Sequence, residues 1–288
     1  MDVPARPAPV QGELDGMAPV VARRLYPCTP TRLTTWLDCP RRYRFTYLDR
    51  PTPPKGPPWA HTGVGAATHT ALARWWGLPR AERTPARGAA LVHGAWPVEG
   101  FRDGGQSARA RAEAARWVSG YLADVDPGEE PVGVERTVSA PTSRLVLSGR
   151  VDRLDARPGG VLAVVDYKTG RRPPEPGEAR SSLAMAVYAV AAARTLRRPC
   201  VRVELHHLPT GTVEAADHDE ASLARKVAEA ESIASDASRA DAAHRAGEGA
   251  DAFPPRPSRL CSWCDFRRHC PQGQAAAPQI EPWAGLPG

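Results

Sequence analysis

The 288-residue sequence has no apolar run that approaches the ~18 residues of a membrane-spanning helix. Its first residues also lack the hydrophobic segment of a secretory signal. No Gly-x-x-x-x-Gly-Lys-Ser/Thr motif occurs, so any ATP-driven unwinding would have to come from another protein. We therefore expect a cytoplasmic protein that is not associated with a membrane and carries no nucleotide-driven motor.

Lysine is scarce, because only Lys55, Lys168 and Lys226 occur among 38 basic residues. Arginine cannot give up its proton in a protein, whereas lysine can. A lysine kept in a chain that otherwise uses arginine therefore suggests a position where arginine would not serve. The net charge of +6 and the pI near 9.2 suit a polyanionic partner.

The length and the 42% hydrophobic content allow one sizeable core. Residues 1–28 are rich in proline and lack periodicity, which predicts a flexible tail. We expect a single domain over residues 29–271 and a second flexible tail over residues 272–288.

Residues 147–155 and 161–170 are rich in Val and Leu and are separated by a turn that contains Pro158, Gly159 and Gly160. This pattern predicts a β-hairpin. Asp152 lies on the first strand, and Asp166 and Lys168 lie on one face of the second. Two carboxylates held close together favour a divalent cation such as Mg²⁺ or Mn²⁺, and an amine beside it can help deprotonate a water for attack on a phosphodiester. An ordinary solvated hairpin would carry the same residue types.

The segments 149–155 and 164–170 resemble the core of the PD-(D/E)XK nucleases, in the RecB-like exonuclease branch. The resemblance implies an α/β fold of the restriction-endonuclease type, with a mixed central sheet flanked by helices. It further implies that Asp152, Asp166 and the backbone carbonyl of Tyr167 bind the metal, while Lys168 assists the attacking water.

Two predicted helices add candidates by the same resemblance. Gly65 and His69, in a helix over residues 62–76, match a family motif whose His is an extra metal ligand. The helix over residues 178–196 matches the Tyr of the family's Gln-x-x-x-Tyr motif with Tyr188, which implies contact with nucleic acid, but Ala184 stands at the Gln position. Glu135, on a strand over residues 131–140, is expected to be a surface residue of an edge strand rather than a metal ligand.

Cys261, Cys264 and Cys270 form a C-x2-C-x5-C pattern, which argues for metal ligation over disulfides in a protein with no secretory signal. A fourth ligand could come from Cys39, His269, Cys28 or Cys200. Four thiolates suit either a [4Fe-4S] cluster or tetrahedral zinc.

Cys39 followed by the three C-terminal cysteines resembles the iron-sulfur subgroup of these nucleases. The relatives by motif are RecB-family and AddB-type exonuclease domains and the CRISPR-associated adaptation nuclease. This resemblance favours a [4Fe-4S] cluster, with zinc as the alternative, that joins the two ends of the domain.

Together these features predict a metal-dependent exonuclease that hydrolyses phosphodiesters of single-stranded DNA or DNA ends in recombination and repair. Its partners would be DNA and a separate helicase or a repair or CRISPR protein. The alternative is a catalytically silent nucleic-acid-binding or scaffold subunit that keeps the fold and the cluster. Ala184 favours this alternative, whereas the intact Asp152, Asp166 and Lys168 argue against it.

Overall fold

The computed structural model describes residues 25–249 and 251–287. The expectation of a flexible tail over residues 1–28 falls mostly on residues outside this part of the chain. Its end is wrong, because Tyr26–Cys28 form a strand that pairs with residues 145–147. The pairing partner lies far along the chain, and no local pattern of three residues around Pro27 signals it.

The strands and helices follow one another in the order β1 (Tyr26–Cys28), α1 (Pro30–Asp38), α2 (Pro40–Tyr47), α3 (Ala60–Trp76), α4 (Pro85–Gly94), α5 (Gly104–Ala123), β2 (Gly133–Pro141), β3 (Leu145–Ala156), β4 (Leu162–Lys168), α6 (Glu178–Ser181), α7 (Leu183–Leu196), β5 (Cys200–His207), β6 (Thr212–Asp217), α8 (Glu220–Arg245) and α9 (Pro271–Ala276). The predicted helix over residues 178–196 is divided at Ser182, whose hydroxyl accepts a hydrogen bond from the Met185 amide and so caps α7. Helix α4 lies in a region where the sequence shows no clear pattern.

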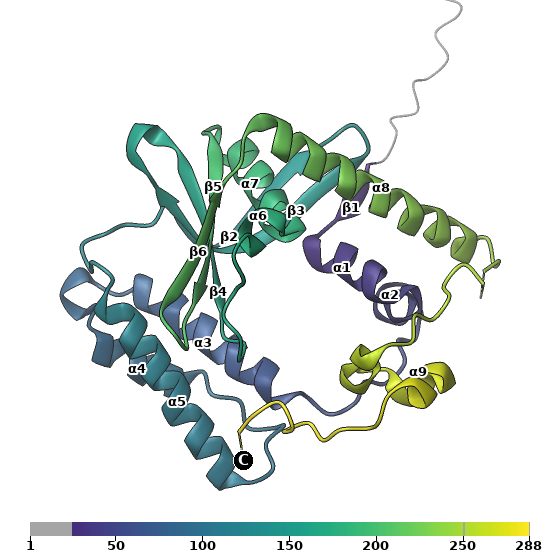
Figure 1. Ribbon diagram of the computed structural model, residues 1–288, viewed down its shortest axis with the longest axis horizontal. Helices are drawn as coiled ribbons and strands as arrows, with labels where there is room; N and C mark the ends of the chain where they lie inside the picture. The colour runs from purple at the N-terminus through teal and green to yellow at the C-terminus, as the bar shows by residue number, and fades with distance from the viewer. Residues whose placement is uncertain (1–24, 250, 288) are drawn as a thin grey trace, which may run out of the picture.

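The strands form one mixed sheet in the order β1-β3-β4-β5-β6, with β2 paired to β3 (Figure 1). Strands β2 and β3, β3 and β4, and β5 and β6 are antiparallel, whereas β1 with β3 and β4 with β5 are parallel. Helices α6 and α7 connect the parallel pair β4 and β5, as a crossover between parallel strands requires. The expected α/β fold with a mixed central sheet flanked by helices is confirmed.

Helices cover both faces of the sheet. Helix α7 packs its small apolar side chains against Leu154, Val164 and Leu205. Helices α3, α4 and α5 form a second apolar cluster with Val165 and Tyr167, which point to the opposite face. Alternate residues of β4 are therefore buried on different sides, and this alternation separates Asp166 and Lys168 from Tyr167.

The segment after α9 returns along the base of the molecule to α3 and α5 (Figure 1). The Ala60 amide donates to the carbonyl of Pro282, and the side-chain amide of Gln106 donates to the carbonyl of Pro287. Leu286 packs against the apolar cluster of α3–α5. Residues 272–287 thus make contacts that the flexible tail expected from the sequence would lack.

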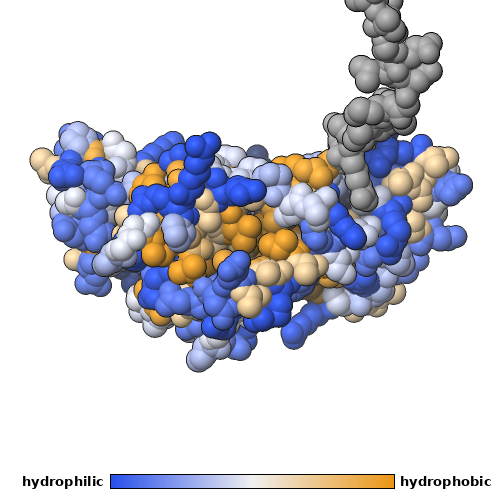
Figure 2. Space-filling model, turned by 90° about the horizontal axis from the view of Figure 1, so that it is seen from above, coloured by the Kyte–Doolittle hydropathy of each residue, from blue (hydrophilic) through white to orange (hydrophobic). Residues whose placement is uncertain are grey.

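The surface seen from above has hydrophobic residues gathered at its middle and hydrophilic residues toward both ends (Figure 2). Among the described residues, no helix combines the length and the apolar character needed to cross a bilayer.

Candidate active site and cysteine cavity

The candidate active site lies where strands β3 and β4 separate. Their ladder ends with the pair Arg153 and Val165, one residue short of Asp152 and Asp166. Beyond this pair the backbone amide of Tyr167 donates to Oδ2 of Asp152 at 2.8 Å, so a carboxylate takes the place of a backbone carbonyl. The separation gives the two aspartates room for a ligand and fixes Asp152 against the peptide of Tyr167.

Asp166 and Lys168 lie on the same face of β4, as the alternation of the strand predicts. Lys168 Nζ is 2.7 Å from Asp166 Oδ2. Burial raises the pKa of the Asp166 carboxyl, and the negative charge of Asp152 adds to the rise, although Lys168 opposes it. A positive ion near the two carboxylates would relieve this repulsion.

His69 reaches the site from α3. Its Nδ1 lies 3.2 Å from Asp152 Oδ1. Burial acts to lower the pKa of His69, but its hydrogen bond to Asp152 and the nearby acidic charges outweigh burial and raise the pKa. One turn earlier, a Cβ on Gly65 would stand 3.1 Å from Thr169 Oγ1, so the small residue lets α3 approach the end of β4 closely.

Glu135 is the site residue that the sequence analysis assigned to the surface. Strand β2 pairs Val134 with Arg153 and Arg136 with Val151 without a shift in register, so Glu135 stands directly opposite Asp152. Its φ of 47° is rare for a residue with a side chain. Donor atoms of Glu135, His69 and Asp152 all lie within 4.8 Å of one another. This left-handed backbone departs from the extended conformation on which the alternation of a strand depends, so the sequence pattern did not indicate where the Glu135 side chain lies.

This set of donors fits a hard divalent cation. Two carboxylates and an imidazole form the compact group, and Asp166 stands beside it with a buried Oδ2 that has no well-aligned hydrogen bond. Carboxylate oxygens are the ligands that Mg²⁺ and Mn²⁺ prefer. Asp166 is not in the compact group, because its carboxylate faces Lys168. Metal ligation by the Tyr167 carbonyl stays a prediction.

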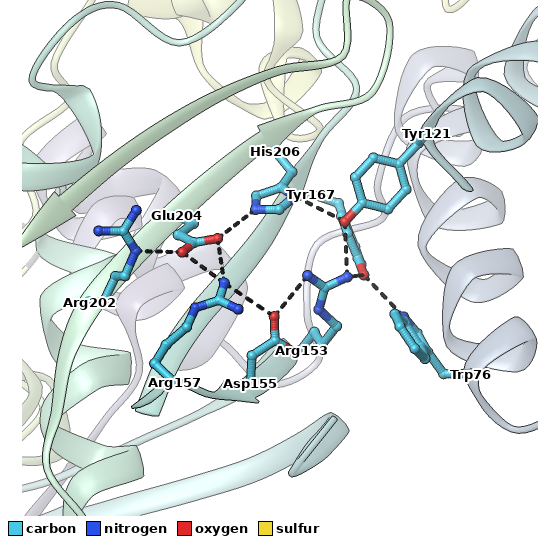
Figure 3. Close-up of polar contacts among 9 residues, drawn as sticks. All are labelled: Trp76, Tyr121, Arg153, Asp155, Arg157, Tyr167, Arg202, Glu204 and His206. Carbon is cyan, nitrogen blue, oxygen red and sulfur yellow. Dashed lines mark hydrogen bonds and ion pairs between the residues drawn. The ribbon is translucent and has the colours of Figure 1, made fainter. Parts of the chain in front are cut away.

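A buried polar network is built around Tyr167 and Arg153 (Figure 3). It lies on the face of the sheet opposite Asp166 and Lys168, because Tyr167 alternates with these residues along β4. Arg153 donates to the hydroxyls of Tyr121 and Tyr167 at 2.9 and 3.1 Å and to Asp155 at 2.9 Å. The indole of Trp76 donates to the same Tyr167 hydroxyl at 3.4 Å. Because the Tyr167 amide holds Asp152, this network fixes the orientation of a peptide that belongs to the active site.

The network extends to strand β5 through Glu204 (Figure 3). The carboxylate of Glu204 accepts hydrogen bonds from Arg157 at 2.9 Å and Arg202 at 2.6 Å, and contacts His206 at 2.9 Å. Tyr121 forms a 2.9 Å hydrogen bond with His206 and so connects the contacts of Glu204 to those of Arg153. Each acid is therefore paired with at least one arginine, as buried charges require.

Replacing Arg153 with alanine should lower the free energy of unfolding by about 3–5 kcal/mol, because Asp155 and two tyrosine hydroxyls would lose a buried partner. Denaturant unfolding measures this loss. The exposed Arg239, which pairs with Asp236, is the control, and its replacement by alanine should cost less than about 1 kcal/mol. Equal costs for the two variants would mean that the network adds nothing beyond a surface ion pair.

Tyr188 packs its ring against Gly149, where a Cβ would stand 2.4 Å from the ring. Burial raises the pKa of Tyr188 to about 12, and the charges of Asp166 and Asp152 contribute. The side chain therefore lies on the α7 side of the two aspartates. Ala184 lies one turn earlier on the same helix.

The four cysteines predicted as ligands line one cavity of about 40 Å³, between α2 and the segment that leads into α9. They are Cys39, Cys261, Cys264 and Cys270. Backbone amides of Arg256, Ser258 and Gly273 donate to the sulfurs of Cys39, Cys261 and Cys270 at 3.4–3.5 Å. Amide hydrogen bonds to sulfur are among the contacts by which proteins tune metal-bound cysteines.

The spacing of these sulfurs is wider than one zinc ion demands. Four thiolates on zinc stand about 3.8 Å apart, because the Zn–S bond is ~2.3 Å and the geometry is tetrahedral. In the part of the chain that the structure describes, no three cysteine sulfurs lie within 4.8 Å of one another. Cys28 and Cys200 stand outside the cavity, and burial raises the pKa of each thiol to about 12.

Two solved structures and one family model are similar to this chain. The crystal structure of SSO0001 is similar to this chain with a TM-score of 0.35 and 12% identity over 85% of each chain. That of a presumed exonuclease from Eubacterium rectale has a TM-score of 0.37 and 14% identity, over 71% of this chain and 86% of the other. No curated protein matches. The model of the PD-(D/E)XK nuclease superfamily matches residues 27–271, and the chain therefore belongs to that superfamily.

Proposed function

We propose that the protein is a metal-dependent DNA exonuclease that hydrolyses phosphodiesters of single-stranded DNA or DNA ends in recombination or repair. The observation that carries the proposal is the convergence of Asp152, Asp166 and Lys168 at the point where β3 and β4 separate. Burial of Asp166 beside Asp152 supports a need for a cation. A silent binding subunit would have no use for this arrangement.

The chain's own residues have separate tasks in this proposal. Asp152, Asp166, His69 and the Tyr167 carbonyl would hold Mg²⁺ or Mn²⁺, and Glu135 would join them from β2. The ion, when bound, supplies positive charge for the phosphate oxygens and acidifies water. Lys168, held against Asp166, would orient the attacking water, and only in its neutral amine form would it accept the proton of that water.

Tyr188 is proposed to contact the nucleic acid, since it lies beside both aspartates. Ala184 cannot provide the amide hydrogen bonds of the family's glutamine at this position. Of the two motif positions, only Tyr188 would therefore contact DNA on this side. Polyanionic DNA also suits the net charge of +6.

The assignment to the RecB-like, iron-sulfur branch rests on the cysteine cavity. We propose that Cys39, Cys261, Cys264 and Cys270 hold a [4Fe-4S] cluster that joins the two ends of a nuclease domain over residues 29–271. The meeting of the four cysteines at one cavity and the amide donors around their sulfurs support a metal group there. A separate cytoplasmic helicase or a repair or CRISPR protein would supply the DNA.

The test of the proposed activity is cleavage of DNA labelled at either end, by anaerobically purified protein with Mn²⁺, Mg²⁺ or EDTA. We expect cleavage with either metal and none with EDTA, and the label pattern gives the polarity. Asp166→Ala should lose activity by a factor of at least about 10², because the ion would lose a carboxylate at the reacting centre. A parent protein that binds DNA and never cuts it would establish the silent subunit instead.

A further inference from the structure

One face of helix α3 connects the candidate metal site to a cluster of aromatic rings. His61, Gly65 and His69 are spaced four residues apart and lie on one stripe of the helix. His69 contacts Asp152, Gly65 adjoins Thr169, and His61 stands beside Trp263. At 1.5 Å per residue the stripe carries His61 about 12 Å from His69 along the helix axis.

The aromatic cluster consists of Trp59, His61 and Trp263. The ring centroids of Trp263 lie 5.1 Å from Trp59 and 5.0 Å from His61. Trp59 is anchored by a 2.9 Å hydrogen bond from its indole to Asp265. Trp263 is 37% exposed, although it is a large apolar residue. These rings are therefore held in place and still present aromatic surface to solvent.

Two members of this cluster, His61 and Trp263, line a cavity of about 510 Å³. Thr169, Gly170 and Arg171, which follow Lys168 at the end of β4, line the same cavity. Burial and the positive charge of Arg171 lower the pKa of His61, so its ring is neutral near pH 7. Glu113 is the acidic residue of the lining. The cavity thus combines flat aromatic surfaces with a cation next to the catalytic lysine.

We propose that Trp59, His61 and Trp263 form a base-stacking subsite for single-stranded DNA, with Arg171 facing the phosphate backbone. The proposal rests on the nuclease function proposed above. A flat π-surface beside a basic group is the combination that binds single strands without sequence preference. A distance of about 12 Å corresponds to about three nucleotides of stacked strand, which sets the subsite about three nucleotides from the scissile phosphate.

The segment that carries Cys261, Cys264 and Cys270 would have a second role in this subsite. Trp263 lies between Cys261 and Cys264, so the geometry of the cysteine cavity sets the position of the ring. Loss of the metal group held there would leave Trp263 without a fixed position and weaken DNA binding. The proposed catalytic residues lie on other elements and would not be displaced directly. The two ends of the chain would thereby both contribute to one DNA-binding surface.

Trp263→Leu and Trp263→Phe test the subsite, because both keep apolar bulk and only Phe keeps an aromatic face. The probe is oligo(dT) of about ten nucleotides, followed by fluorescence anisotropy in EDTA. Trp263→Leu should raise Kd about tenfold, the ~1.4 kcal/mol expected from one stacked base, and Trp263→Phe by less than about threefold. His61→Ala should weaken binding in the same direction, whereas Val213→Ala, on an exposed surface of β6, should leave it unchanged.

Substrate length separates this subsite from a general disturbance of the fold. With Mn²⁺, Trp263→Leu should raise the KM of long strands and leave cleavage of a dinucleotide at the parent rate, since a dinucleotide does not reach the subsite. Iron content and the visible spectrum of each variant are measured to exclude loss of the metal group. Equal affinities of Trp263→Leu and the parent, or equal losses for Leu and Phe, would overturn the subsite while DNA cleavage by the parent still supports the nuclease. A parent protein that neither binds nor cuts DNA would contradict both the stacking subsite and the proposed nuclease function.

Discussion

Replacement of Lys168 by arginine should reduce metal-dependent DNA cleavage by about 10²- to 10⁴-fold, although the positive charge is kept. Lys168 Nζ lies 2.7 Å from Asp166 and is the only basic side-chain atom paired with that carboxylate among the described residues. Arginine can form this ion pair, but it cannot take a proton from water and return it. Cleavage rates at saturating Mn²⁺ measure the effect.

The chain offers a matched control for this substitution. Lys226→Arg makes the same chemical change on the surface of α8, where the amine contacts Glu229 and the carbonyl of Ser181. This variant should cleave DNA at the parent rate. If Lys168→Arg also cleaved at the parent rate, the site would need only a positive charge at this position, and the role of Lys168 in proton transfer would be wrong.

Cys39→Ser should remove the brown colour of the anaerobically purified protein and lower its melting temperature by about 10 °C or more. Cys39 and Cys261 enclose most of the chain, and a cross-link over a loop of more than 100 residues is worth about 5 kcal/mol in the chain-entropy model. Removing one of four ligands opens this loop. Iron analysis, the visible spectrum and thermal unfolding measure the loss.

Cys28→Ala provides the comparison, because Cys28 is buried under α1 and α8 and stands outside the cysteine cavity. It should keep the colour and the iron content of the parent. If the parent protein is colourless and contains zinc, the four cysteines form a zinc site and the assignment of a [4Fe-4S] cluster is wrong. If the parent protein contains no metal at the cysteines and Cys39→Ser leaves its stability unchanged, then no metal group joins the two ends of the domain.

The catalytic hairpin was predictable because its signals are local. Alternation of apolar residues, a Pro-Gly-Gly turn and the spacing of Asp166 and Lys168 depend on neighbours within a few residues. The same holds for α1 and α2, where Thr29 caps the first helix and Pro40 begins the second. His69 was reached through the motif resemblance, and the structure brings it to Asp152.

Non-local geometry decided the rest. The register of β2 against β3 places Glu135 opposite Asp152, and no residue of β2 indicates this pairing. The network around Arg153 depends on side chains from α3, α5, β3, β4 and β5 that meet only behind the folded sheet (Figure 3). Tyr26–Cys28 became a strand because β3 offers an edge.

By itself, the sequence determined the class of fold and indicated the two aspartates, the lysine and the set of cysteines as candidates, because each is encoded in residue type and short spacing. Only the tertiary structure decided that β3 and β4 separate at Asp152, that Glu135 lies close to His69 and Asp152, and that Trp263 packs against His61 of α3. These features depend on the packing of segments far apart in the chain, where the free energy of contact outweighs local preference.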